Sequence, residues 1–498
     1  MAPHRFLVAS VALAAAVPAC RPPRPSPAPP SPSPSPVSAP EPAPEPVDPT
    51  ADLPAWAVAA AKKIAAHRAV AGHRAYERLA FVADTIGPRP SGSTALARAI
   101  DWAVTELAGY GLENARREPV MVPVWVRGKE SAKVVAPVER DLVMLGLGGS
   151  VGTRGRLRGR IAVVDHVDEI AKKGPALSGK IVLINQVMPR YDVERHRAFY
   201  GETVVARSRG AIEAAKVGAK AVLVRSVTAR SLRTPHTGAM HYAEGVPKIP
   251  AAAVTVEDAE FLVRSARRGP VTVELSMGAR TRKDAPSANV VAELPGRSER
   301  DAIALLGCHI DSWDVGDGST DDMGGCIAIM EAARILAELE LFPRRTIRVV
   351  LFTNEEHGLR GAKAYFEAHG GERHVAVFEA DAGQGAPLAF SVAGPARERE
   401  ALEAFLPLFL DFGVTAFVAG GAGADVSPLV EAGVLGIGHR PDGSRYFDLH
   451  HSPADTVDKI DPDHLATNAA GIALLAYILA ERPLPDASKA GPGAGRRR

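Results

Sequence analysis

The sequence predicts an α/β protein with a mixed, mainly parallel sheet flanked by helices, and a strand-rich α+β domain inserted into it. Two observations lead to this prediction. From residue 288 onward, short hydrophobic runs alternate with amphipathic helical stretches, which is the pattern of a helix-flanked parallel sheet. Between about residues 126 and 287, short β-like runs alternate with turns and one clear helix, which indicates a second, smaller domain.

The composition limits the classes of protein to which the chain can belong. Its 498 residues are 46% hydrophobic, which is enough for two domains with cores of their own. The formal net charge of +2 gives no indication of a nucleic-acid partner. Three cysteines cannot build a disulfide framework, and we expect Cys308 and Cys326 to be small core residues.

The first 20 residues have the features of a signal peptide. A weakly basic start, "MAPHR", is followed by an apolar stretch too short to span a bilayer and by the small residues "VPAC". This ending resembles a bacterial lipoprotein signal, which would make Cys20 the lipidated first residue. Val17 and Ala19 also suit ordinary secretory cleavage. Both alternatives predict export, as a cell-envelope lipoprotein or as a periplasmic or secreted protein. Contact with the membrane is expected only through a lipid anchor.

Residues 21–54 are rich in proline, serine and alanine, so we expect an extended linker. Helical spacing of apolar residues then begins near residue 55 and ends at the "GPRPSGS" breaker. A second helix should follow, with Ser93 or Thr94 as its N-cap. In the inserted region, the β-like runs are "RIAVVD", "KIVLINQ", "AVLVRS" and "VTVELSM", and the clear helix is "GAIEAAKVGA".

Acidic residues are crowded into "HIDSWDVGDGSTDD", residues 309–322, which contains five aspartates and one histidine. Neighbouring carboxylates raise one another's pKa unless a positive charge lies between them. The stretch follows a buried strand, "AIALLGCHID", and precedes a helix, so it leaves the carboxyl end of a strand, where open α/β sheets bind ligands. His309 and Asp311 are two residues apart and should face the same side of the strand.

Three further strand ends carry residues of the same kinds. "TIRVVLFTNEEHG" brings Glu355 and Glu356, "VAVFEADAG" brings Asp381, and "GVLGIGH" leads to "HHSPADT" and then to a helix that begins at Asp461. Each has a simpler explanation on its own; for example, Asp322 could cap a helix and Glu355 could be a surface charge. Together they favour a metal site, and His, Asp and Glu without thiolates suit Zn²⁺, with Co²⁺ or Mn²⁺ as alternatives.

These motifs resemble peptidase family M28, the co-catalytic zinc peptidases, and within it the carboxypeptidase Q branch. "HIDSWDVGDGSTDDMGG", "NEEHG", "EADAG" and "HHSPADT" match in order, and "LGLGGSVGT", "TPHTG" and "GVPKIPAAAVTVEDAE" resemble that branch's protease-associated (PA) domain. The resemblance covers about residues 60–480. It implies a catalytic domain in two parts (55–125 and 288–484) and a PA-like insert (126–287). The composition of the chain ends predicts a signal peptide (1–20), a linker (21–54) and a disordered basic tail (485–498).

The resemblance also implies roles for individual residues. Two Zn²⁺ ions per chain would be bound, one by His309 and Asp381 and the other by Glu356 and His451, with Asp321 bridging them. Of the paired histidines, His451 matches the family's ligand because it precedes Ser452. Glu355 matches the general base, Asp311 the residue that orients His309, and the peptide bond between Asp321 and Asp322 is expected to be cis. Asp314 and Asp317 have no role in this scheme, and we expect them to be solvated.

The expected activity is hydrolysis of short peptides or dipeptides by metal-activated water, in a homodimer. The alternatives are an aminopeptidase that acts on longer peptides, and a non-peptidase relative of the glutaminyl-cyclase or receptor type. Asp425, in "GAGADVSPLVEAGV", is a candidate substrate contact. The segment "HRPDGSRYFDL" is arginine-rich where the animal enzymes are apolar. Arg440 or Arg445 could therefore bind the free carboxylate of a short peptide, although a solvated loop is the alternative.

Overall fold

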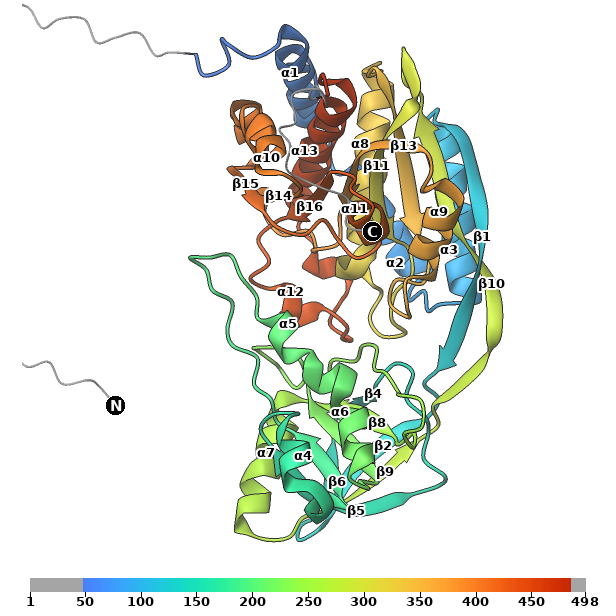
Figure 1. Ribbon diagram of the computed structural model, residues 1–498, viewed down its shortest axis with the longest axis vertical. Helices are drawn as coiled ribbons and strands as arrows, with labels where there is room; N and C mark the ends of the chain where they lie inside the picture. Colours follow the sequence, from blue (N-terminus) through green and yellow to red (C-terminus); the bar gives the residue numbers. More distant parts are fainter. Residues whose placement is uncertain (1–47, 485–498) are drawn as a thin grey trace, which may run out of the picture. The chain divides into compact units, whose positions relative to one another are not determined.

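Two eight-stranded sheets form the framework of the computed structural model, which describes residues 48–484 (Figure 1). The predicted signal peptide with Cys20, most of the predicted linker and the predicted basic tail lie outside the described residues. From Pro49 onward the chain forms one compact unit. The boundaries expected at residues 125 and 287 therefore stay a prediction.

The first sheet is mixed and mainly parallel, as the sequence predicts. Parallel pairs join β12 to β11, β11 to β13, β13 to β16 and β14 to β15, whereas the remaining neighbours are antiparallel. Its strands, in spatial order, are β1 (Glu113–Val126), β10 (Arg280–Leu294), β12 (Arg345–Phe352), β11 (Glu299–His309), β13 (Arg373–Glu379), β16 (Gly436–Arg440), β14 (Ala389–Ala393) and β15 (Ala416–Ala419).

Helices cover both faces of this sheet, which is why its central strands are hydrophobic throughout. On β11, Leu306 and Cys308 pack into the core cluster that contains α8 (Gly324–Glu338) and α13 (Pro462–Glu481). Ile303 and Leu305 alternate to the other face, where α9 (Arg360–His369) and α11 (Ser427–Glu431) pack. Among the described residues, α13 is the one helix long and apolar enough to cross a membrane. Because 78% of its most apolar window is buried inside the protein, its hydrophobicity is explained by the core.

Three helices precede the first sheet, where the sequence indicated two. The expected single helical stretch is divided into α1 (Ala55–Val70) and α2 (Arg74–Thr85), because the chain turns at Gly72, whose φ of +65° is incompatible with a continuous helix. The prediction for α3 (Thr94–Gly109) is confirmed. Of the two candidate N-caps, Ser93 has this role, since its side chain accepts a hydrogen bond of 3.1 Å from the Leu96 N–H.

The second sheet uses strands from residues 130–277, and all four β-like runs of this region form strands. Its spatial order is β3 (Arg140–Leu142), β2 (Glu130–Ala136), β9 (Thr272–Met277), β5 (Leu157–Val164), β6 (Ile181–Ile184), β7 (Ala221–Arg225), β8 (Ala251–Val254) and β4 (Met144–Gly146). The helix predicted at "GAIEAAKVGA", residues 210–219, overlaps α6 (Val205–Lys216), which begins five residues earlier and ends three residues before the predicted stretch. α4 (Glu169–Lys173) and α7 (Val256–Arg268) complete the helices that pack on this sheet (Figure 1).

A disulfide lies directly behind the acidic segment. Cys308, on β11, and Cys326, on α8, are both fully buried, as expected of core residues, and they are also bonded to each other. This bond was not predicted from the sequence, because the two cysteines are separated by the whole loop that connects a strand to its following helix. The bond ties the strand end that carries His309 to the helix that follows the aspartates.

The two sheets meet tightly at Trp313, and this contact can be tested. A Cβ atom at Gly148, just after β4, would lie 1.9 Å from the Trp313 ring, which is 3% exposed. We therefore expect Gly148→Ala to lower the free energy of unfolding by about 1–3 kcal/mol in urea denaturation. Gly109→Ala is the matched control, because no atom lies within 4 Å of the added methyl group and alanine favours a helix end. Equal stability of the two variants would contradict this packing.

Candidate metal centre and active site

Four strand ends meet at one edge of the first sheet, because β12, β11, β13 and β16 are parallel neighbours. His309 ends β11 opposite Phe352, the last residue of β12, and Glu379 at the end of β13 pairs with Gly438 on β16. The residues that follow these strands therefore emerge at one edge of the sheet. The paired histidines come after β16, at the end of the short helix α12 (Tyr446–Leu449).

The structure brings all five predicted metal ligands together around Asp321. The Nε2 atom of His309 lies 3.2 Å from Asp321 Oδ1 and 3.8 Å from Asp381 Oδ1. The Nε2 atom of His451 lies 3.2 Å from Asp321 Oδ2 and 3.0 Å from Glu356 Oε2. Each oxygen of Asp321 thus faces a different histidine. Two groups of potential ligands in the described chain share this residue, and their donor atoms lie within 4.8 Å of one another.

The charges of this cluster suit divalent cations. Burial alone would raise the pKa of Asp321, but His450, His309 and His451 around it hold that pKa well below its ordinary value. Asp321 Oδ2 and Glu356 Oε1 are buried and have no hydrogen bond within residues 48–484. Buried carboxylate oxygens without donors are costly unless a cation faces them. Imidazole and carboxylate ligands without thiolates fit Zn²⁺, since the two nearby cysteines are joined in the disulfide.

A tightly held turn presents Asp321. Residues Ser319–Met323 form a kinked turn in which Asp321 and Asp322 have non-helical backbone angles, and the Asp321–Asp322 peptide bond is cis, as the resemblance led us to expect. The Asp455 carboxylate accepts hydrogen bonds from the N–H groups of Thr320 (2.6 Å) and Asp321 (3.1 Å). Asp322 does not cap α8; its carboxylate accepts a hydrogen bond of 3.2 Å from the His309 N–H instead. Both aspartates therefore hold the main chain of the site in place.

Arg89, in the "GPRPSGS" segment, is fully buried beneath this turn. Its guanidinium donates hydrogen bonds to the carbonyls of Ile310 (2.9 Å), Asp317 (2.7 Å) and Gly318 (3.0 Å). These carbonyls lie on both sides of the loop that connects β11 to Asp321, so one planar side chain sets the loop's path. From its sequence, this segment was predicted only to be a helix breaker, and no role was predicted for the arginine.

Asp314 and Asp317 are half-buried and bonded to groups of the protein, so the expectation that they are merely solvated was wrong. The Asp314 carboxylate is held in two hydrogen bonds by Arg127, at 2.9 and 2.5 Å. Asp317 accepts hydrogen bonds from Ser319 and from the Val457 N–H. Arg127 and Val457 are distant in sequence, so neither partner was visible from the local pattern. Both aspartates therefore stabilise the loop and are not among the proposed metal ligands.

Glu355 and Asp311 lie beside each other at the strand ends. Asp311 Oδ1 accepts a hydrogen bond of 3.0 Å from the Glu355 N–H and so fixes the turn that carries Glu355. The ring of His309 is closer to the Asp311 main-chain oxygen (3.0 Å) than to its carboxylate (4.0 Å). The Glu355 carboxylate has no hydrogen bond to any described residue. Burial, together with the negative charges of Glu356 and Asp381, raises its pKa well above the ordinary value.

The paired histidines are held by loops of the second sheet. His450 stacks on His451 with ring centroids 3.5 Å apart, and His450 Nε2 lies 3.6 Å from Asp321 Oδ2. The carbonyl of His450 is 2.7 Å from His236 Nδ1, and that of His451 accepts a hydrogen bond of 2.9 Å from the Thr237 N–H. Both rings therefore face Asp321, and the choice of His451 as the ligand stays a prediction.

The three candidate substrate contacts lie in different surroundings. Asp425 is 2% exposed, and neither carboxylate oxygen has a hydrogen-bond partner in the described chain. Its pKa is raised well above the ordinary value by burial and by the negative charges of Glu379 and Glu355. Arg440 is turned toward β14, where its Nε donates to Ser391 Oγ at 3.0 Å. The Arg445 guanidinium has no hydrogen bond or ion pair among the described residues; it interacts electrostatically with Asp448 and lines a cavity.

Comparisons with known proteins agree with this geometry. Residues 289–476 match the model of peptidase family M28. The chain is 41% identical over 415 residues to carboxypeptidase Q of Bos taurus, which covers 82% of this chain and 86% of that protein, and 40% identical to the Homo sapiens enzyme with the same coverage. It also resembles the crystal structure of a peptidase M28 precursor from Shewanella amazonensis, with 36% identity and a TM-score of 0.81 over 86% of this chain and 99% of that one. A zinc aminopeptidase from Bacillus subtilis shares the fold, with 19% identity, a TM-score of 0.60 and coverage of 82% and 95%.

The role of Arg89 can be tested by a conservative replacement. Lysine keeps the charge but cannot reach carbonyls on both sides of the loop, so Arg89→Lys should leave buried acceptors unpaired. We expect the free energy of unfolding in urea to fall by on the order of 3 kcal/mol. Arg98→Lys is the matched control, because Arg98 is exposed and has one long hydrogen bond of 3.4 Å to the Ile86 carbonyl. If the two variants were equally stable, Arg89 would not organise the loop.

Proposed function

Because the chain belongs to peptidase family M28, with carboxypeptidase Q among its relatives, we propose that it is a dinuclear zinc exopeptidase that hydrolyses short peptides. The observation that carries this proposal is the position of Asp321, whose two oxygens face His309 on one side and His451 on the other. One carboxylate shared between two sets of ligands is what a pair of neighbouring cations requires.

The residues present fit two Zn²⁺ ions. His309 and Asp381 would hold one ion, Glu356 and His451 the other, and Asp321 would contact both. When bound, the ions would supply Lewis-acid chemistry, polarising a peptide carbonyl and acidifying a water molecule. The protein's contribution is to hold the ligands rigidly. Thr320 and Asp321 are tied to Asp455, and His309 is tied through its main chain to Asp322.

Glu355 has the features of a general base in this proposal. Its carboxylate has no hydrogen-bond partner within the described chain, whereas its main chain is fixed by Asp311. The side chain is therefore held in place, and its carboxylate is free to accept a proton. Burial and the neighbouring carboxylates raise its pKa, which makes it a better proton acceptor. Glu355 would take a proton from the attacking water and deliver it to the leaving amine. The adjacent Glu356 lies 3.0 Å from His451 and would be committed to a metal ion.

The alternatives fit the site less well. A cyclase-like or receptor-like relative does not need every ligand and the base, yet all six residues meet at this edge. An aminopeptidase acting on longer peptides stays possible from the ligands alone, and the substrate side of the site decides between these activities. We propose a homodimer and a PA-like insert from the sequence resemblance, and export, with or without a lipid on Cys20, from the features of residues 1–20.

The number of bound ions provides a first test. Elemental analysis of the purified protein after equilibration with zinc should find close to two ions per chain. Asp321→Asn, which weakens a ligand common to both positions, should lower the occupancy of both ions. A wild-type content of one ion per chain would contradict the dinuclear proposal and favour the cyclase-like alternative.

The role of Glu355 provides a second test. Glu355→Gln keeps the size of the side chain but removes the proton acceptor, so we expect the metal content to persist and kcat for a dipeptide to fall by about two orders of magnitude or more. Glu367→Gln, an exposed position on α9, is the matched control for loss of one negative charge. Near-wild-type turnover by Glu355→Gln would exclude Glu355 as the base.

A further inference from the structure

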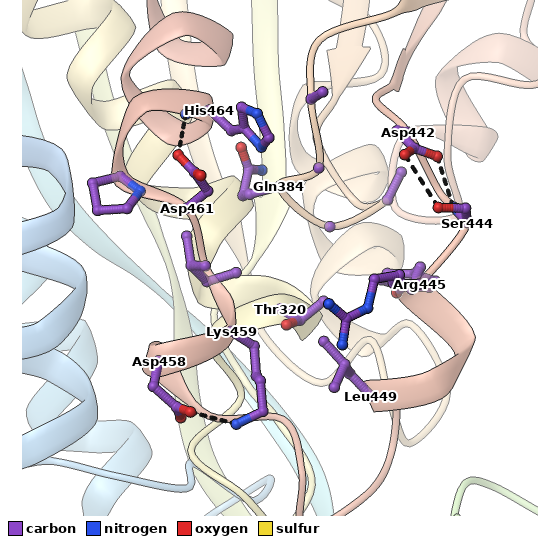
Figure 2. Close-up of a pocket in the computed structure, with 17 residues that line it drawn as sticks. Thr320, Gln384, Asp442, Ser444, Arg445, Leu449, Asp458, Lys459, Asp461 and His464 are labelled. Carbon is purple, nitrogen blue, oxygen red and sulfur yellow. Dashed lines mark hydrogen bonds and ion pairs between the residues drawn. The ribbon is translucent and has the colours of Figure 1, made fainter. Parts of the chain in front are cut away.

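A cavity of about 510 Å³ lies beside the candidate metal centre. Its walls come from three segments: residues 382–386 after β13, residues 442–449 around α12, and residues 458–464 at the start of α13 (Figure 2). The cavity reaches the candidate centre through two of its lining residues. Thr320 precedes Asp321, and the Tyr446 hydroxyl lies 3.5 Å from Asp381 Oδ1. A ligand group in this cavity is therefore one side chain away from the proposed metal ligands.

The carboxylates that line the cavity are already bonded to groups of the protein. Asp442 accepts hydrogen bonds from the Ser444 N–H (2.9 Å) and hydroxyl (3.1 Å). Asp461 caps α13 by accepting from the N–H groups of residues 463 and 464. Asp458 is bonded to Lys459 and to the hydroxyl of Thr456. None of these carboxylates faces the cavity as a free negative charge.

Arg445 is different from every other charged group in this wall. Of the lining carboxylate, ammonium and guanidinium groups, it alone has no hydrogen bond or ion pair with a described residue. Figure 2 shows its guanidinium turned toward the cavity, on the side of Thr320 and Leu449. A guanidinium presents two parallel N–H donors, which match the two oxygens of a carboxylate.

Gln384 also lines the cavity, but its amide does not add a second donor to the wall. Gln384 is 4% exposed, and its Oε1 accepts a hydrogen bond of 3.1 Å from Asn468 Nδ2, which fixes the orientation of the amide. Its Nε2 is thereby left as a buried donor without an acceptor in residues 48–484. Because this nitrogen has almost no accessible surface, it does not face the cavity, and it does not contact a ligand there. Leu449, Ile460 and Pro462 add an apolar surface to the wall.

We propose that this cavity binds a carboxylate group of the substrate, with Arg445 as its partner. The inference rests on the proposed peptidase function and adds the chemistry of the substrate. The carboxylate would belong either to the free C-terminus of a short peptide or to an acidic side chain near the scissile bond. Arg440, the other candidate from the sequence, does not line the cavity and already donates to Ser391.

The test compares substrates that differ only in one carboxylate. The first pair is a dipeptide and its C-terminal amide, and the second pair is a dipeptide amide that ends in glutamate or in glutamine. We expect wild type to prefer the carboxylate-bearing member of one pair, which identifies the source of the carboxylate. Arg445→Ala should lower kcat/KM for that member by roughly tenfold to a hundredfold, and for its partner by less than about threefold. Arg445→Lys should restore part of the preference.

Further variants and a binding assay complete the experiment. Arg397→Ala, an exposed arginine away from the cavity, is the matched control for loss of one positive charge, and Arg440→Ala should keep the preference within about twofold. Calorimetric titration with a dipeptide analogue whose scissile bond is reduced, as free acid and as amide, should show the same dependence on Arg445 without turnover.

Several outcomes would overturn the inference. Equal cleavage of both members of each pair by wild type would do so while leaving the peptidase function intact. An equal loss of kcat/KM on both members of a pair in Arg445→Ala would show that Arg445 has a structural role. Loss of the preference in Arg440→Ala but not in Arg445→Ala would show that Arg440, and not Arg445, binds the carboxylate. If wild type cleaved no peptide, the proposed function would fail. The calorimetric titration would then test the carboxylate site separately from turnover. Equal binding of the free acid and of the amide would exclude this site.

Discussion

The architecture of this edge of the sheet depends on one electrostatic constraint: several carboxylates are buried together and must be neutralised. Asp311, Asp321, Asp322 and Glu356 are each at most 6% exposed. Repulsion between such groups is weakly screened inside a protein, so the fold requires positive charge among them. Arg89 supplies one permanent charge in the interior, and the histidines supply a second source that depends on pH. The remaining negative charge is the physical reason to expect bound dications.

Arg89 also determines the path of the loop that carries these aspartates. Its burial lowers its pKa, while Asp317, Asp455, Asp311 and Asp322 nearby act in the opposite direction. The guanidinium makes its hydrogen bonds to main-chain carbonyls of the loop and leaves these carboxylates to other partners. Asp455 and Asp322 are therefore available to hold the N–H groups of Thr320, Asp321 and His309. One buried cation thus organises the loop, and the aspartates around it fix the residues that face the proposed ions.

The sequence could predict the site wherever the deciding interactions are local. Alternation along a strand and the meeting of parallel strand ends were sufficient to place His309, Glu355, Glu356 and Asp381 together. Partners distant in sequence were not predictable, which is why Asp314 was wrongly expected to be solvated and the pairing of Cys308 with Cys326 was missed. Arg89 was missed for another reason: between glycine and prolines, an arginine looks like part of a turn. The break at Gly72 depends on how two helices pack, which helical periodicity does not reveal.

The second sheet takes part in the site through the backbone of the paired histidines. His451 has a φ of +60°, a left-handed conformation that costs a non-glycine residue about 1–2 kcal/mol. The hydrogen bond from Thr237 to its carbonyl and the contact of Arg207 with its Nδ1, at 3.3 Å, offset that cost. Both partners belong to the region of the second sheet, whereas Asp321 and Glu356, which face the ring's other nitrogen, belong to the first. The direction of this ring is therefore set from both sides, so the region of the second sheet contributes to the geometry of the proposed metal centre.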